Sequence, residues 1–286
     1  MLQLLSLYTN RMVTLGGVQG LESIFSNCRL GIKMILVQRH FQVDKAHRGA
    51  FERMSSRGLW PAMREMGMQM VAYGTWGFAG SGQVVVTHSV YADFDHWYAT
   101  RRSLPGHSAG SKVGSFYEDP EIFGKFKHLM HTYAERESLV NYSEATPFLM
   151  DEGLSRPKVH YRLAGGPASE LPPTFGRGSI VEQADFTYES NATAETSKDL
   201  LANYIWPDLE SKGARVIGLG TNALKGDETF STFVAYPSFR EFVEYGRAPH
   251  QNVSNDVAQA WLQNNGLVKT VERRLLIIGT GYGETN

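Results

Sequence analysis

The order of apolar and polar positions predicts the same series of elements twice along the chain. Runs rich in Val, Ile, Leu and Phe predict strands, and apolar residues three or four positions apart predict helices. In the first half, the predicted strands are 34–43, 68–74, 83–91 and a last strand near the end, and the predicted helices are 45–66 and 94–102. In the second half, the strands are 179–188, 214–220, 230–236 and 269–278, and the helices are 194–212, 239–246 and 253–264.

Short motifs recur in the same order in both halves. Trp60-Pro61 recurs as Trp206-Pro207, inside the first predicted helix of each half. A proline there lacks a backbone donor and predicts a kink or a fresh start of the helix. A Gly-Thr pair ends the next strand of each half, at Gly74 and Gly220. Several matched features in one order and at nearly constant spacing indicate a duplicated unit.

Aligning the two copies pairs individual residues. The pairs are Arg39 with Asp185, His40 with Phe186, His88 with Phe233, Arg102 with Arg247, and Glu135-Arg136 with Glu272-Arg273 before the last strand.

The predicted fold class is α+β, with two tandem ferredoxin-like units of the order β-α-β-β-α-β. The four-stranded antiparallel sheet of such a unit carries helices on one face and needs cover on the other. Two sheets packed together meet that need and enclose a barrel-like space. The predicted limits are 34–150 for the first unit and 179–286 for the second, with a Pro- and Gly-rich linker at 151–178 and an N-terminal arm or presequence at 1–33.

The composition narrows the class of protein. The net charge of −1 lacks the basic excess of a nucleic-acid binder, and no apolar run approaches the roughly 20 residues that cross a membrane. The single cysteine, Cys28, cannot form an internal disulfide or a cysteine metal cluster. We therefore expect a cytoplasmic protein, with a mitochondrial presequence at 1–33 as the alternative, and leave a homo-oligomer open.

Three segments then resemble the NIPSNAP family. They are the opening strand Met34-Ile35-Leu36-Val37-Gln38-Arg39-His40-Phe41, the third strand Val84-Val85-Val86 with Tyr91 and Arg101-Arg102, and the closing segment with Asp119-Pro120-Glu121, Arg136 and Thr146-Pro147-Phe148. The resemblance spans about residues 34–150 and, more weakly, 179–282. It departs from the family at Thr87 and Ser89, where the family often has histidine and tryptophan.

The resemblance implies a dimeric α+β barrel. Relatives with that fold include cofactor-free monooxygenases, isomerases and haem enzymes, while some family members are vesicle- or mitochondrion-associated. Because one fold serves many functions, the fold alone does not choose among them.

Nine residues of the first half are candidates for a site. Histidine is a general base near neutral pH, and a guanidinium orients a carboxylate or enolate. The catalytic candidates are His88, His40, Arg39 and Arg102, and the substrate-binding candidates are Tyr73, Trp76, Tyr91, Trp97 and Tyr98. The alternatives are sheet-edge hydrogen bonds for the histidines, helix caps or ion pairs for the arginines, which include Arg136, and core packing for the aromatic residues.

A metal site is a weaker candidate. His128, His131 and Glu135 share one face of a probable helix, and imidazole with carboxylate is compatible with a metal. Nearby lysines instead favour a solvated helix face, so we predict no metal and no tightly bound organic cofactor.

The leading hypothesis is an enzyme that acts on a small apolar carbonyl- or phenol-type substrate, by proton abstraction or oxygen transfer in a barrel cavity. The competing hypothesis is a non-catalytic binding or adaptor protein of the NIPSNAP kind. Seven of the nine histidines lie before residue 151, so we expect any active site in the first copy.

Overall fold

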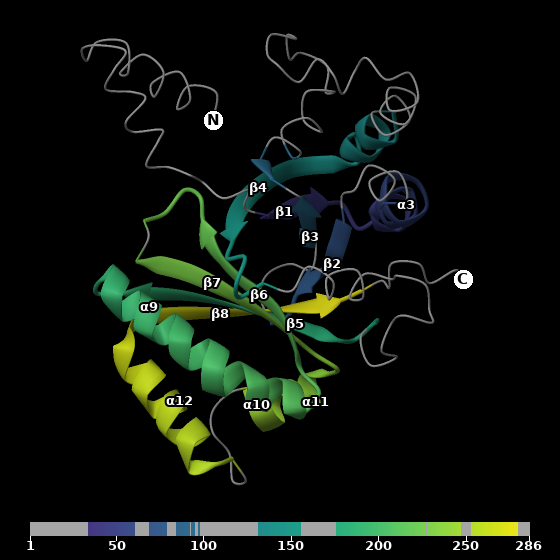
Figure 1. Cartoon of the computed structure of the whole chain (residues 1–286). Helices are drawn as coiled ribbons and strands as arrows, with labels where there is room; N and C mark the ends of the chain where they lie inside the picture. Colours follow the sequence, from purple (N-terminus) through teal and green to yellow (C-terminus); the bar gives the residue numbers. More distant parts are fainter. Residues whose placement is uncertain are drawn as a thin grey trace, which may run out of the picture. The chain divides into compact units, whose positions relative to one another are not determined.

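The computed structural model describes residues 34–60, 69–78, 84–91, 93–94, 97, 131–155, 176–226, 228–246 and 253–279. All of them belong to one compact unit that begins at Lys33. Its strands close a single barrel (Figure 1). The first repeat supplies β1 (Ile35–Val43), β2 (Gln69–Trp76), β3 (Val84–Tyr91) and β4 (Val140–Met150), and the second supplies β5 (Ile180–Tyr188), β6 (Arg215–Asn222), β7 (Thr229–Tyr236) and β8 (Val268–Ile278).

Each repeat forms an antiparallel sheet with the ferredoxin-like strand order. The orders are β4-β1-β3-β2 and β8-β5-β7-β6, and the sheets join through β2 with β8 and β4 with β6. Each joint is short, running from Gly74↔Ile278 to Trp76↔Leu276 and from Phe148↔Asn222 to Met150↔Gly220. The predicted fold class is confirmed, and the sheets not only face each other but also share their edges.

The strand register establishes which residues of the repeats are equivalent. Gln38 pairs with His88 across β1 and β3, and Gln183 pairs with Phe233 across β5 and β7. Both repeats also have a bulge at the same place in β2 and β6, at Val71 and Ile217. A bulge inserts one residue into one strand of a pair, so its recurrence is strong structural evidence of duplication.

Three predicted pairings of the repeats are wrong. The register makes His40 the equivalent of Asp185 and Arg39 the equivalent of Ala184, one position away from the sequence alignment. Arg136 lies on the helix at residues 131–137, whereas Arg273 lies within β8 and pairs with Ala184. Leu149 and Ile277 are equivalent, because they pair with the equivalent residues Ile35 and Ile180. Counting back the same number of residues from each reaches Arg136 and Asn264, which are therefore equivalent. A two-residue motif carries too little information to fix a register.

Helices cover the outer face of each sheet. The first repeat has α3 (Arg48–Arg53) and η1 (Met54–Leu59), and the second has α9 (Asn191–Leu200), η2 (Leu201–Ile205), α10 (Trp206–Ser211), α11 (Phe239–Glu241), η3 (Phe242–Gly246) and α12 (Asn255–Leu267). Ser190 and Ser254 cap α9 and α12, accepting hydrogen bonds from the backbone N–H groups of Thr193 and Val257. Among the described residues, no helix is long and apolar enough to cross a membrane.

Trp60 and Trp206 occupy matching places. Each follows directly on a π-helical turn, and each is buried. Pro207 stands in the first turn of α10, where its missing N–H costs nothing. The wider π turn before it relieves the clash that a proline ring makes with the preceding turn. The predicted fresh start is therefore confirmed at Pro207, while Pro61 lies outside the described residues.

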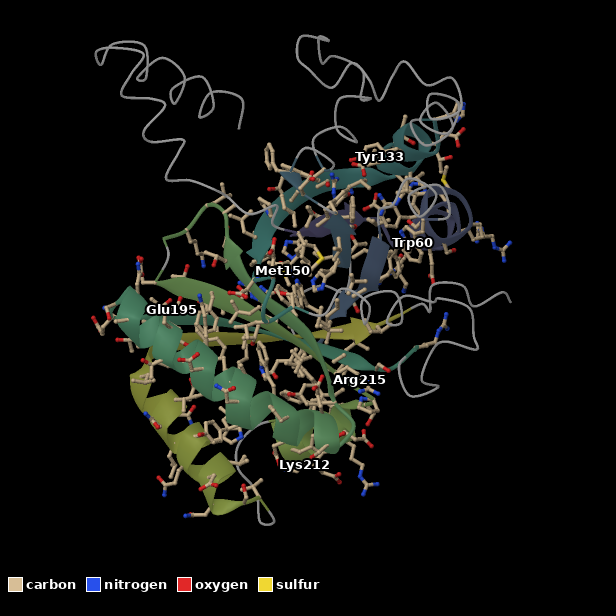
Figure 2. The ribbon with its side chains drawn as sticks, in the orientation of Figure 1. Trp60, Tyr133, Met150, Glu195, Lys212 and Arg215 are labelled. Carbon is tan, nitrogen blue, oxygen red and sulfur yellow. The ribbon has the colours of Figure 1, made fainter. Side chains whose placement is uncertain are left out.

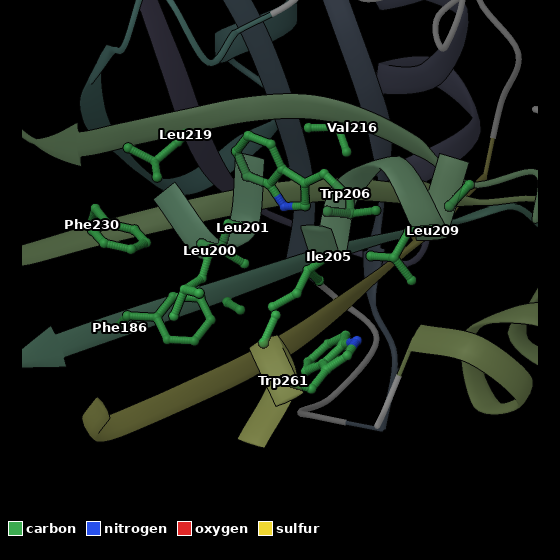
Figure 3. Packing of buried hydrophobic residues seen from close by; sticks show 14 of the residues in the cluster. Phe186, Leu200, Leu201, Ile205, Trp206, Leu209, Val216, Leu219, Phe230 and Trp261 are labelled. Atoms are coloured by element: carbon green, nitrogen blue, oxygen red, sulfur yellow. The ribbon is translucent and has the colours of Figure 1, made fainter. Parts of the chain in front are cut away.

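Three apolar layers form the core. One lies between the first sheet and its helices, one lies between the second sheet and its helices, and the third fills the barrel lumen with residues of both repeats. Figure 3 shows Leu201, Ile205 and Trp206 packed against the second sheet, with Trp261 of α12 beside them. In Figure 2, Met150 lies between the two sheets, and Trp60 and Tyr133 lie on the helix side of the first repeat. The predicted domain limits stay predictions, because 1–33 and most of the linker lie outside the described residues.

Candidate functional site

Two buried arginines lie between the first sheet and its helices. Arg39, on β1, is 8% exposed, and Arg136, on the helix at 131–137, is 1% exposed. The guanidinium carbon of Arg136 lies 4.2 Å from the ring centroid of Phe41 and 4.0 Å from that of Phe51. Stacking on aromatic faces compensates part of the cost of burying a cation. The layer that contains these two arginines is called the arginine layer below.

The two arginines have different partners. Arg136 donates through Nε to Ser55 Oγ at 2.6 Å and through Nη1 to Glu137 Oε1 at 3.3 Å. Arg39 donates through Nη1 to the hydroxyl of Tyr133 at 2.9 Å. Burial lowers the pKa of Arg136 to about 10, so its guanidinium keeps its charge at neutral pH. Among the described residues, the layer thus holds two guanidiniums and one carboxylate, Glu137, that is hydrogen-bonded to Arg136 alone.

Tyr73 adds a hydrogen-bond donor to the arginine layer. Its ring lies 5.0 Å from that of Trp60, and its hydroxyl is buried without a hydrogen-bond partner among the described residues. Burial raises the pKa of Tyr73, and the nearby Glu52 carboxylate raises it further, so the hydroxyl stays protonated at neutral pH. A buried hydroxyl that forms no bond costs stability, which makes Tyr73 a candidate for contact with a bound molecule.

Four of the nine predicted site residues meet in the first repeat's outer layer. Arg39 lies beside the cluster that contains Tyr73, Tyr91 and Trp97. Arg136, which the sequence offered only as an ion pair or an anion-orienting residue, is at the centre of this layer. Arg102 and Tyr98 lie outside the described residues.

The second repeat has different chemistry in the same layer. Ala184 and Asn264 replace the two arginines, and the buried carboxylate of Glu182 accepts from Arg273 Nη1 at 2.7 Å and from the hydroxyl of Tyr236 at 3.1 Å. Burial raises the pKa of Glu182, although both donors favour its ionised form. A cavity of about 20 Å³ adjoins this group, bounded chiefly by apolar and aromatic residues. It has room for about one water molecule.

The remaining predicted residues, His88, His40 and Trp76, face the barrel lumen. His88 is fully buried, and its Nε2 lies 2.8 Å from Gln38 Nε2, which also donates to Gln183 Oε1 at 2.5 Å. The ring of His88 contacts that of Phe233 with centroids 5.5 Å apart. Because successive strand residues point to opposite faces, His40 and Arg39 cannot contact the same bound molecule. The structure therefore does not bring the predicted histidines and Arg39 together.

One end of the lumen is polar. His40 Nδ1 lies 2.5 Å from Glu144 Oε1, and His40 Nε2 accepts from the indole N–H of Trp76 at 3.2 Å. The hydrogen bond from His40 lowers the pKa of Glu144. Arg274 lies 3.8 Å from Asp185, and its guanidinium carbon lies 5.9 Å from the ring centroid of Trp76, so both repeats contribute residues to this end of the lumen.

Sequence reasoning missed Gln38, Gln183, Glu144 and Arg274 in the lumen. Gln38 and Gln183 gave a signal, because polar residues recur at alternate positions of their largely buried strands. Glu144 and Arg274 gave none, because their strands contain many other polar residues. The metal hypothesis finds no support among the described residues, where no three His, Cys, Asp or Glu side chains are grouped to hold an ion. His131 and Glu135 form an exposed pair at 3.3 Å, and His128 lies outside the described residues.

No protein-family model matches this chain, and no curated protein matches it. Among solved structures, one similar protein is provisionally assigned as a monooxygenase, from Fusobacterium nucleatum subsp. nucleatum ATCC 25586; the match covers 90% of this chain and 97% of that one, at 10% identity and a TM-score of 0.55. Another, with the same provisional assignment, comes from Lactobacillus acidophilus NCFM; the match covers 88% and 97%, at 10% identity and a TM-score of 0.53. This chain has the dimeric α+β-barrel fold.

At these identities the likeness shows the fold alone. A NIPSNAP family protein from Agrobacterium tumefaciens str. C58 matches over 42% of this chain and 88% of its own, at 16% identity and a TM-score of 0.29, which is too low to decide the family. The barrel of this chain is complete within one polypeptide, because each repeat supplies four of its strands.

Proposed function

We propose that this protein is an enzyme for a small, mostly apolar molecule with a carbonyl or phenol group, and that it works through an enolate or phenolate held in the arginine layer. The observation that carries the proposal is the presence of two buried donors in one layer. They are the guanidinium of Arg136 and the hydroxyl of Tyr73, and this hydroxyl has no hydrogen-bond partner among the described residues. Donors fixed in a dry site stabilise a developing oxyanion strongly, because they need no reorganisation during the reaction.

The same layer supplies the other parts of such a reaction. Glu137 is the carboxylate beside Arg136, and it is placed to accept the proton that leaves the substrate. Tyr91 and Trp97 belong to the surrounding apolar cluster and suit an aromatic substrate. The enolate or phenolate is then reprotonated at carbon, or its nucleophilic carbon adds O2 to give a hydroperoxide. That hydroperoxide loses water to leave a carbonyl, so one oxygen atom stays in the product and the other leaves as water with two hydrogen atoms of the substrate. The provisional monooxygenase assignments of the two similar structures support the second course.

The proposed site lies in the outer layer of the first repeat, whereas the sequence favoured a site in the barrel cavity. Apolar side chains of both repeats pack against one another in the lumen, among them Leu36, Phe148, Met150 and Phe233. The predicted catalytic roles of His40 and His88 do not belong to this site, because both face the lumen.

The test is a turnover screen with matched variants. Purified protein is offered phenols and hydroxyaryl ketones in air, while O2 uptake and the absorbance of the substrate are followed. Tyr73→Phe and Arg136→Asn should each lower kcat by about 100-fold or more, as is usual for loss of an oxyanion donor. His40→Gln, on the other face of β1, should leave kcat unchanged. Full activity in both layer variants, with folding intact by circular dichroism, would refute the proposal.

The second candidate is a non-catalytic binding or adaptor protein of the NIPSNAP kind. The apolar contacts between the two repeats in the lumen favour it, since they are those of a structural interface. Absence of turnover across the screen, combined with stable capture of a partner protein through this chain, would favour this candidate over the enzyme.

A further inference from the structure

The charges of the arginine layer do not balance among the described residues. Glu137 is hydrogen-bonded to Arg136 and attracts Arg39 only through space, whereas the hydrogen bond of Arg39 goes to the hydroxyl of Tyr133. Arg39 is nevertheless nine-tenths buried. Burying an ionised group is costly unless an opposite charge compensates it, and a guanidinium cannot escape the cost by losing its proton near neutral pH.

The fold itself does not require a cation at this position. In the second repeat the equivalent residue is Ala184, which lies in the apolar cluster of that layer, beside the ion pair of Arg273 and Glu182. Asn264 likewise takes the place of Arg136 and accepts a hydrogen bond from Ser197 at 2.5 Å. The second copy thus forms without arginines at these two positions, and the arginine that it does contain, Arg273, is paired with the carboxylate of Glu182. Arg39 has no such carboxylate partner among the described residues, so packing alone does not explain its burial.

We infer that Arg39 is the anchor for a carboxylate carried by the substrate, so that the substrate is an aromatic or unsaturated carboxylic acid. This inference rests on the proposed function and names the substrate class of the same site. The guanidinium offers two parallel N–H groups that match the two oxygens of a carboxylate. The apolar cluster around it, with Tyr91 and Trp97, accepts the body of such an acid, while Tyr73 and Arg136 hold its reacting oxygen.

Binding of the simplest probe, benzoate, tests the anchor separately from turnover. Titration calorimetry and thermal unfolding are run with benzoate and with the neutral isostere benzamide, at fixed ionic strength. Benzoate should bind saturably and raise Tm, whereas benzamide should bind at least tenfold more weakly. Arg39→Ala, which introduces the residue of the second repeat, should lower the affinity for benzoate at least tenfold, and Arg39→Lys should restore part of it.

Arg240→Ala is the matched control, because it removes an equal charge from an exposed pair with Glu244 in the second repeat. Its affinity for benzoate should equal that of the unaltered protein. Should Arg39→Ala fail to fold, Arg39→Gln replaces it. Equal binding of benzoate and benzamide, or unchanged binding of benzoate by the Arg39 variants, overturns the inference. Turnover of neutral phenols without benzoate binding would refute the anchor alone, whereas benzoate binding without turnover of any substrate would refute the enzyme alone.

Discussion

Gln38 and Gln183, equivalent residues of the two repeats, hydrogen-bond to each other in the barrel lumen. Gln38 Nε2 lies 2.5 Å from Gln183 Oε1, and both side chains are buried. Equivalent residues touch only near the axis that relates the repeats, so this contact marks the centre of the barrel. Gln38 also joins His88, and Gln183 Nε2 donates to Asp185 at 2.9 Å. The buried amides therefore link the two repeats by a polar chain rather than by apolar packing alone.

The glutamine contact predicts a coupled loss of stability. Gln183→Met should lower the free energy of unfolding by about 1–3 kcal/mol, because it leaves the amide of Gln38 buried with one donor unused. The double variant Gln38→Met, Gln183→Met should lose less than the sum of the single variants. Urea unfolding measures each value, and strictly additive losses would contradict a direct bond. The exposed Gln42→Met is the control, with a change within about 0.5 kcal/mol.

Substitution of the glycines at the two joints between the sheets should affect stability unequally. A Cβ at Gly74 would collide with the backbone oxygen of Ile277, while one at Gly220 would lie 2.8 Å from the flexible end of Met150. Backbone cannot move aside cheaply, so Gly74→Ala should cost about 3 kcal/mol or more, the upper part of the range for overpacking, and Gly220→Ala about 1 kcal/mol. Chemical denaturation measures the unfolding free energy of both variants. A larger loss of stability for Gly220→Ala than for Gly74→Ala would show that the β2–β8 joint is looser than described.

Removal of the Tyr73 hydroxyl should lower activity without lowering stability. Because its hydroxyl forms no hydrogen bond among the described residues, Tyr73→Phe should leave the free energy of unfolding unchanged or raise it by up to about 1 kcal/mol. Tyr188→Phe removes a hydroxyl that lies 2.6 Å from Ser197 Oγ and should lower stability by about 1 kcal/mol. Denaturation curves of the Tyr73→Phe and Tyr188→Phe variants measure both changes in stability. A destabilised Tyr73→Phe would mean that the hydroxyl serves the fold, which would weaken its proposed role in the site.

Glu182 predicts a dependence of stability on pH. Burial raises the pKa of this carboxyl in the folded state above its value in the unfolded chain, so its contribution is present at low pH and is lost as the pH rises through the folded pKa. Glu182→Gln removes this titration. The difference in unfolding free energy between the unaltered protein and Glu182→Gln should therefore shrink, or turn against the unaltered protein, as the pH rises above about 4.5. If the stability of the unaltered protein relative to Glu182→Gln instead grows with pH, the ion pair with Arg273 lowers the pKa of Glu182 more than burial raises it.

Much of the fold could be predicted because it depends on local patterns. The strand at β1 was expected at 34–43 and spans Ile35–Val43, and the strand at β8 was expected at 269–278 and spans Val268–Ile278. The matching places of Trp60 and Trp206 follow from one motif read twice. These features depend on residue types a few positions apart, which a single sequence shows directly.

The sequence by itself determined the order of the elements, the duplication and the set of candidate residues, since period and composition are properties of the chain alone. Only the tertiary structure decided which of those residues share a site. On β1 the residues Ile35 to Arg39 are all buried, so the usual alternation of buried and exposed positions is absent. A strand buried on both faces gives no sign of which face meets the helices and which meets the lumen. For that reason Arg39 and His40 are both catalytic candidates from the sequence, whereas the closed barrel places Arg39 with Tyr133 in the arginine layer and His40 with Glu144 and Trp76 in the lumen.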